Sequence, residues 1–318
     1  MMRFLQRLAV FSIPFVVYIA FIVAVDPFAY LNIVHTAQER KIANASALNQ
    51  CFWKMNEFRQ HPVPRILLGD SRMLPIRPKM LLAKTGDEYF NFAYGGSSLQ
   101  EMIETFWFAS RLTELREVYI GLNLNVYNDY NSTDRTAMFT TINSNPALYL
   151  VNRTVLRAAV YDVYSWATRT DLKIGVPNMS REAFWQEQLG PLTAAYYTSY
   201  VYPEKYKRRL EEIGAYCKAH GIRLRFIIFP THVELQNRVH DFHLERAAAQ
   251  FRQDLAHIGQ TFDFDYQNDI TSRKENFSDP YHYTEPIVPV LVREVWLGQP
   301  QYARVDGNPH VSHSGAAN

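Results

Sequence analysis

The chain has 318 residues, 47% of them hydrophobic, and a formal net charge of +2. This length can bury the core of one large domain, and a nearly balanced charge without a long basic stripe argues against nucleic-acid binding. The two cysteines, Cys51 and Cys217, are too few for a disulfide framework, so we expect free or buried thiols in preference to a single bridge.

The N-terminus carries a candidate membrane helix. Arg3 and Arg7 precede an uncharged stretch over residues 8–25, which as a helix at ~1.5 Å per residue would extend about 27 Å, close to the ~30 Å hydrocarbon core of a bilayer. The alternatives are a cleaved signal peptide and a core helix, but the stretch is long for a signal peptide and no Ala-x-Ala site precedes Asp26. We therefore expect residues 1–26 to be an uncleaved single-pass anchor, with the arginines in the cytoplasm and the rest of the chain outside it.

Downstream of the anchor, apolar runs alternate with helix-like segments. After a stem over 28–45 and a helix over 47–60, strands are predicted at Arg65–Leu68, Tyr89–Ala93, Glu117–Ile120, Arg223–Phe229 and Thr261–Tyr266. Helices are predicted at Ser98–Thr113, Pro203–Ala219, Leu244–Ile258 and Thr284–Trp296. Strands that alternate with helices predict a parallel sheet covered on both faces, which is an α/β fold with three α/β/α layers.

Two segments fall outside this alternation. The stretch 124–202 holds an amphipathic helix over Pro146–Thr168 and ends in a tyrosine-rich segment. We interpret it as a helical insertion beside the carboxyl edge of the sheet, either a lid over a site or a cap that only packs. Residues 299–318 are polar with Gly, Pro and Ser and are predicted to be a disordered tail, so the main domain is expected to span 27–298.

Several predicted strands end in residues suited to acyl chemistry. The first ends in Gly69-Asp70-Ser71, which would place a serine at the carboxyl edge of the sheet, where α/β proteins bind ligands. Asp279 and His282 are spaced so that one turn can carry a base and its orienting carboxylate, the parts that make a serine nucleophilic. Gly96 and Asn123 follow the second and third strands and offer an N–H and an amide to a developing oxyanion.

In this order the residues resemble the four blocks of the SGNH (GDSL-like) hydrolase superfamily. Ser71 matches the first block, Gly96 the second (with Asn91 five residues before it), Asn123 the third, and Asp279 with His282 the last. The resemblance implies a flavodoxin-like parallel sheet and a catalytic triad of Ser71, His282 and Asp279. It also implies an oxyanion hole formed by the Ser71 and Gly96 N–H groups and the Asn123 side chain. We expect no cofactor and no metal.

The chain departs from the family pattern at two places. Arg72 follows the serine where typical members carry leucine, and the third block lacks the acid that commonly follows its asparagine. Asn125 is therefore a rival to Asn123 as the oxyanion donor. We expect Asp70 to fix the serine turn and not to join the triad.

An anchored chain with an altered first block is similar to the superfamily branch that includes the D-alanine transfer protein of teichoic acid export and the accessory O-acetyltransferases of alginate export. This resemblance implies an acyl-transfer enzyme on the periplasmic side of a bacterial inner membrane. Its partners would be an acyl donor, an exported or cell-envelope polysaccharide as acceptor, and a membrane-bound O-acyltransferase. The sequon at Asn276, close to Asp279, favours a bacterial source because a glycan would crowd the site there. Two alternatives stay open: an esterase that removes acyl groups with the same triad, and an inactive polymer-binding scaffold.

Overall fold

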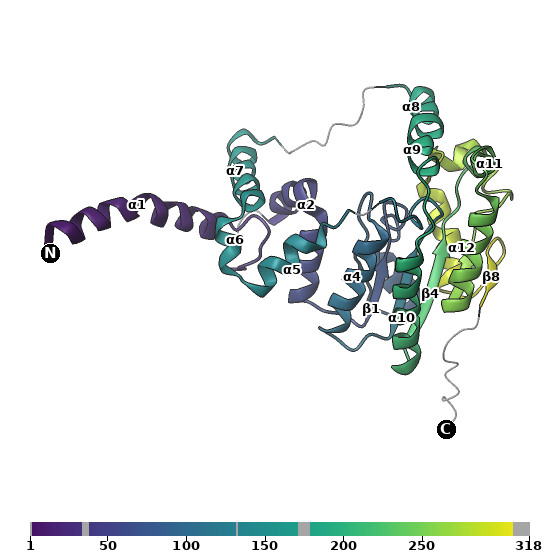
Figure 1. The fold of residues 1–318 in the computed structure, drawn as a ribbon, viewed down its shortest axis with the longest axis horizontal. Helices are drawn as coiled ribbons and strands as arrows, with labels where there is room; N and C mark the ends of the chain where they lie inside the picture. The colour runs from purple at the N-terminus through teal and green to yellow at the C-terminus, as the bar shows by residue number, and fades with distance from the viewer. Residues whose placement is uncertain (1, 34–37, 132, 171–178, 308–318) are drawn as a thin grey trace. The chain divides into compact units, whose positions relative to one another are not determined.

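A six-stranded sheet in the order β2-β1-β3-β4-β5-β8 organises the larger of two units in this computed structural model (Figure 1). The structure describes residues 2–33, 38–131, 133–170 and 179–307.

The two units divide the chain differently from the predicted domains. The sheet unit comprises residues 61–134 and 177–318, and the second unit comprises residues 1–60 and 135–176. The predicted insertion over 124–202 is thus split, because its middle part packs with the N-terminal residues while its ends belong to the sheet unit.

The sheet confirms the predicted α/β class. Its strands are β1 (Arg65–Leu68), β2 (Phe90–Asn91), β3 (Glu117–Gly121), β4 (Arg223–Ile228), β5 (Gln260–Asp263) and β8 (Arg304–Asp306). The first five are parallel, and β8 pairs antiparallel with β5. Because β8 lies in the tail predicted to be disordered from residue 299, that prediction is wrong for residues 304–306. Residues 308–318 lie outside the described residues.

Helices cover both faces of the sheet. The sheet unit contains α3 (Pro78–Thr85), α4 (Leu99–Ser110), α8 (Arg181–Glu187), η1 (Gln188–Leu192), α9 (Thr193–Tyr197), α10 (Glu204–Ala219), α11 (Val233–Asp241), α12 (Glu245–Ile258), η2 (Lys274–Asn276), η3 (Glu285–Ile287) and α13 (Val288–Val295). Leu67, Tyr119 and Ile227, from three neighbouring strands, share one core with residues of α3 and α13. The helices α4, α10 and α12 pack beside one another in front of the sheet in Figure 1. This is the predicted three-layer arrangement.

The strand order also fixes where a site should lie. From β1 the chain continues to β2 on one side of the sheet and then to β3, β4 and β5 on the other side. The crevice at the carboxyl ends of β1 and β3 is therefore the topological switch point, and open α/β sheets bind ligands at this point. Ser71 follows β1, and Asn123 and Asn125 follow β3.

The second unit is helical. It contains α1 (Met2–Val25), α2 (Gln38–Gln60), α5 (Thr136–Ser144), α6 (Ala147–Val151) and α7 (Arg153–Thr168). The helix predicted over Pro146–Thr168 is broken at Asn152, because the Asn152 side chain accepts the Thr154 and Val155 N–H groups and starts α7 afresh.

The helix α1 confirms part of the predicted anchor. It is long and apolar enough to cross a membrane, a test that a signal sequence also passes. Its last turn packs into the helical unit, where Ile22 is fully buried and Asp26 accepts a hydrogen bond from the Tyr149 hydroxyl over 2.7 Å. Both cysteines are buried and free, as expected.

Candidate active site

Ser71 lies in the turn that directly follows β1. A side chain at Gly69 would clash, because its Cβ would lie 2.8 Å from the Met73 Cβ. The Met73 N–H donates to the Asp70 carbonyl over 3.1 Å, and the Leu74 N–H donates to the Ser71 carbonyl over 3.3 Å. The turn therefore holds Ser71 at the edge of the sheet, where this residue is half-buried and still reachable from solvent.

Ser71, His282 and Asp279 form a continuous chain of hydrogen bonds. Ser71 Oγ lies 2.7 Å from His282 Nε2, and His282 Nδ1 lies 2.9 and 2.7 Å from the two carboxylate oxygens of Asp279. The Asp279 side chain is 8% exposed and the His282 side chain 35%. In this geometry a histidine can take the serine proton while a buried carboxylate fixes its tautomer and orientation. The structure thus brings together the three residues predicted as a triad.

A short hairpin carries both Asp279 and His282. Its strands are β6 (Phe277–Asp279) and β7 (His282–Tyr283), which pair antiparallel. Asp279 Oδ1 accepts the backbone N–H groups of Tyr281 over 2.8 Å and of His282 over 3.1 Å. The carboxylate is therefore fixed by its own turn, which is why a spacing of three residues suffices.

Two residues outside the predicted triad and oxyanion hole hold this hairpin in place. The Tyr283 hydroxyl donates to the Arg72 carbonyl over 2.5 Å, and the His232 N–H donates to the Pro280 carbonyl over 2.9 Å. The buried His232 ring also caps α11 by accepting the Glu234 N–H, and burial lowers the pKa of His232. A tyrosine one residue after a histidine gives no signal by itself in a chain with 20 tyrosines.

Asp70 and Arg72, on either side of the serine, form a buried ion pair. Arg72 donates to Asp70 from Nε over 3.1 Å, from the guanidinium over 2.5 Å and from its backbone N–H over 3.0 Å. Burial would raise the pKa of the Asp70 carboxyl, but the charge and hydrogen bonds of Arg72 outweigh it and hold that pKa below its usual range. Asp70 is thus a fixed anion of the turn.

The residues of the second block also surround the serine turn. Asn91 Nδ2 donates to the carbonyls of Met73 and Ile76, both over 2.9 Å, so Asn91 ties the end of β2 to the segment after Ser71. Gly96 is exposed in the loop before α4 and has a φ of 62°. This left-handed conformation favours glycine, so the backbone alone gives a reason for the residue.

The two asparagines of the third block have different partners. Asn123 Nδ2 donates to the Phe229 carbonyl over 2.8 Å and lies 3.4 Å from Asp265 Oδ2. Asn125 Oδ1 accepts from Arg72 over 3.1 Å, and in the described part of the chain its amide nitrogen has no acceptor. The structure therefore directs the Asn123 amide toward the ends of β4 and β5, and leaves the Asn125 amide nitrogen available beside Arg72.

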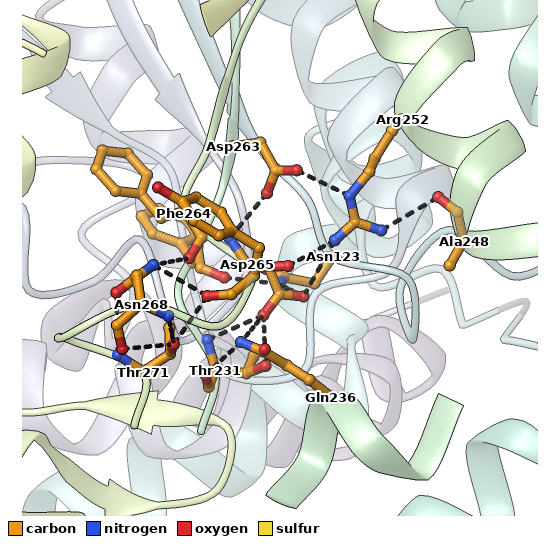
Figure 2. A network of polar contacts seen from close by, with 12 residues as sticks. Asn123, Thr231, Gln236, Ala248, Arg252, Asp263, Phe264, Asp265, Asn268 and Thr271 are labelled. Carbon is orange, nitrogen blue, oxygen red and sulfur yellow. Dashed lines mark hydrogen bonds and ion pairs between the residues drawn. The ribbon is translucent and has the colours of Figure 1, made fainter. Parts of the chain in front are cut away.

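Asn123 instead belongs to a polar network at the carboxyl ends of β4 and β5 (Figure 2). Asp265 Oδ1 accepts from the Thr231 N–H over 3.1 Å, from the Thr231 hydroxyl over 2.5 Å and from Gln236 over 3.2 Å. Arg252 donates to the Asp265 carbonyl over 2.6 Å. Burial raises the pKa of the Asp265 carboxyl, although Arg252 opposes that shift.

The network lines a cavity of about 120 Å³, whose wall also includes Asn125 and Tyr197. Asp265 is not among the predicted site residues, because it lies in a segment where phenylalanine and aspartate alternate and not directly after an apolar run. Among the described residues, no group of three or more His, Cys, Asp or Glu side chains is arranged to hold a metal ion.

Solved structures similar to this chain include one that is assigned to the predicted family. They include TesA, at 11% identity over 73% of this chain and 95% of that chain with a TM-score of 0.36, and a Slackia heliotrinireducens protein assigned as an SGNH hydrolase, at 15% identity over 74% and 99% with a TM-score of 0.34. A Streptococcus pneumonia protein assigned as a platelet activating factor shares 10% identity over 83% of this chain and 99% of that chain with a TM-score of 0.44. No family model and no curated protein sequence matches the chain. At such low TM-scores these likenesses carry no weight for activity, which has to be inferred from the side chains.

Proposed function

We propose that this chain is a membrane-anchored acyl-transfer enzyme that works through an acyl-serine intermediate. The observation that carries the proposal is the hydrogen-bonded chain from Ser71 Oγ through His282 to Asp279. It lies at the switch point of an α/β sheet, where a substrate would reach it.

The reaction follows from the triad geometry. Ser71 Oγ attacks the carbonyl carbon of an ester or thioester, and His282 Nε2 takes the hydroxyl proton. When the tetrahedral intermediate collapses, the bond to the leaving group breaks, and His282 returns the proton to the departing oxygen or sulfur. An acceptor hydroxyl then gives its proton to His282 and attacks the acyl carbon of the acyl-serine. The bond from that carbon to Ser71 Oγ breaks, His282 returns the proton to Ser71 Oγ, and the new ester leaves. Asp279 holds the Nδ1–H throughout.

The negative charge on the carbonyl oxygen needs donors that are in place before the reaction. The Ser71 and Gly96 N–H groups remain the proposed backbone donors. For the side-chain donor, the contacts favour Asn125 over Asn123, because the Asn123 nitrogen is already bound to the Phe229 carbonyl. Arg72 holds the Asn125 oxygen, which would turn the Asn125 nitrogen toward the substrate and gives a role to the arginine found in place of leucine.

The anchor and its orientation are part of the proposal. The buried Ile22 and the Asp26–Tyr149 hydrogen bond favour an uncleaved α1, because cleavage before Asp26 would remove Ile22 from the core of the helical unit. Arg3 and Arg7 favour a cytoplasmic N-terminus. The catalytic residues would then lie on the periplasmic side of a bacterial inner membrane.

For the substrates, the resemblance to anchored transferases favours an exported or cell-envelope polysaccharide as acceptor, with acyl groups supplied by a membrane-bound O-acyltransferase. Water can attack the same acyl-serine, so an esterase is the second candidate function. A scaffold without catalysis is the third.

The test uses the full chain in nanodiscs with a chromogenic acetyl ester, with and without the polysaccharide. Transfer predicts chromophore release and acetyl esters on the polymer, both lost in Ser71→Ala. Release with no acetylated polymer would favour the esterase. If the wild type neither releases chromophore nor reacts with a serine-directed inhibitor, the scaffold is correct.

A further inference from the structure

The helix α7 presents an exposed face with an unusual composition for a surface that meets only water. We call Arg153, Arg157, Val160, Val163 and Tyr164 the α7 face. Arg153, Arg157, Val160 and Tyr164 recur at helical spacing and form one stripe, and Val163 lies beside it. Val160 is 53% exposed, Val163 43% and Tyr164 59%. Single exposed apolar residues are ordinary, but neighbouring aromatic and branched side chains on one helix mark a contact surface.

The opposite side of α7 is packed and polar in part. Val155, Ala158 and Ala159 are buried there together with Asp162, which accepts a hydrogen bond from Asn44 of α2 over 2.8 Å. The orientation of α7 within its unit is therefore fixed by its buried side, so the α7 face is presented outward by the fold.

The neighbour of α7 identifies what could cover this face. α7 packs against α1, which is apolar enough to cross a membrane and has exposed apolar side chains such as Phe11 and Val16 along most of its length. In Figure 1, α7 lies beside the C-terminal end of α1 and runs crosswise to it. A helix in that position would lie along the surface of the bilayer that α1 spans.

The chemistry of the α7 face suits a lipid headgroup layer. Tyrosine, here Tyr164, prefers the membrane–water interface because its ring has an apolar body and a polar edge. Val160 and Val163 would reach the upper acyl chains, and Arg153 and Arg157 would attract anionic headgroups.

We propose that the α7 face lies against the headgroup region of the membrane that α1 spans. The contact would make the helical unit a membrane-bound platform with two attachment elements, one across the bilayer and one along its surface. The proposal rests on the proposed membrane anchor α1, but it does not depend on the acyl-transfer chemistry, because no residue of the α7 face belongs to the triad or its surroundings.

The experiment places nitroxide labels on the full chain in nanodiscs of phosphatidylethanolamine and phosphatidylglycerol. Labels are attached to Tyr164→Cys and, separately, to Val160→Cys. A label on Ala249→Cys, at an exposed position of α12 in the sheet unit, is the control. The natural cysteines are buried, and the wild type treated with the same reagent measures any labelling of them. The readout is the collision of each label with lipid-soluble oxygen and with a water-soluble nickel complex.

The proposal expects the labels at 160 and 164 to collide with oxygen several-fold more, relative to the nickel complex, than the label at 249 does. Equal ratios at all three positions would overturn it. A label at 160 or 164 that is shielded from both reagents would also overturn it, since the face would then be covered by protein. Circular dichroism of each labelled chain, compared with the wild type, shows that the variant has folded.

Discussion

Tyr283 donates its phenolic hydrogen to the backbone carbonyl of Arg72 over 2.5 Å, which joins the strand that carries His282 to the turn that carries Ser71. These two segments are 211 residues apart in sequence, and the hydrogen bond between Ser71 and His282 depends on their relative position. Burial raises the pKa of Tyr283, so the hydroxyl keeps its proton and donates it at neutral pH.

Tyr283→Phe should therefore lower kcat while the KM changes little. The lost hydrogen bond is worth about 1 kcal/mol, which corresponds to a loss of about fivefold in rate. Tyr30→Phe is a matched control, because the Tyr30 hydroxyl also donates to a backbone carbonyl, that of Ile142, but in the helical unit. Steady-state kinetics with an acetyl ester check this; equal effects of both variants would show that Tyr283 has no special part in alignment.

Asn125→Ala should slow turnover a few hundredfold, because loss of one oxyanion donor typically costs ~3–4 kcal/mol in the barrier. Asn123→Ala should leave kcat nearly unchanged and reduce stability by about 1 kcal/mol, because it removes the hydrogen bond to the Phe229 carbonyl. The two are compared by ester kinetics and thermal unfolding. The reverse pattern would return the donor role to Asn123, as the sequence blocks suggested.

Arg72→Leu should destabilise the sheet unit by about 3–5 kcal/mol, although leucine is the residue that typical family members carry. The reason is that Asp70 would be left buried without its partner. The double variant Asp70→Asn with Arg72→Leu should recover much of this stability, because no buried charge is then unpaired. Chemical unfolding of the full chain in detergent gives both values; no recovery in the double variant would mean that Arg72 stabilises the turn by other contacts.

The helical unit should become more stable as the pH falls from 7 to 5. Burial raises the pKa of Asp162 to about 6, even though Asn44 and Lys41 favour its charged form. Because the folded pKa lies above the unfolded value, the folded state binds the proton more tightly, so ionisation near pH 6 costs stability. Asp162→Asn should remove this dependence and stabilise α7 at pH 7. Hydrogen exchange of the α7 amides measures it, and slower exchange at pH 7 than at pH 5, after correction for intrinsic rates, would contradict it.

The sequence predicts those parts of the site whose residues are close together along the chain. Gly69-Asp70-Ser71 could be placed because an apolar run ends there, and Asp279 with His282 because three residues separate them within one turn. The choice between Asn123 and Asn125 could not be made in the same way. It depends on Arg72, which follows a different strand and holds the Asn125 oxygen.

The division of the chain into two units could also not be predicted from the sequence. It rests on contacts between distant residues, such as Tyr149 with Asp26 and Asp162 with Asn44. Local periodicity gives no information about these pairs. β8 has only three residues at the sheet edge, which is too short for an alternating pattern to stand out among polar neighbours.

The most direct test of the central claim is covalent labelling of Ser71. The full chain in detergent is treated with a fluorophosphonate, and the modified peptide is identified by mass spectrometry. A serine activated by His282 and Asp279 predicts a single modification on Ser71 in the wild type, none in Ser71→Ala or His282→Ala, and much slower modification in Asp279→Ala. An unmodified wild type, or a His282→Ala variant modified at the wild-type rate, would contradict the account.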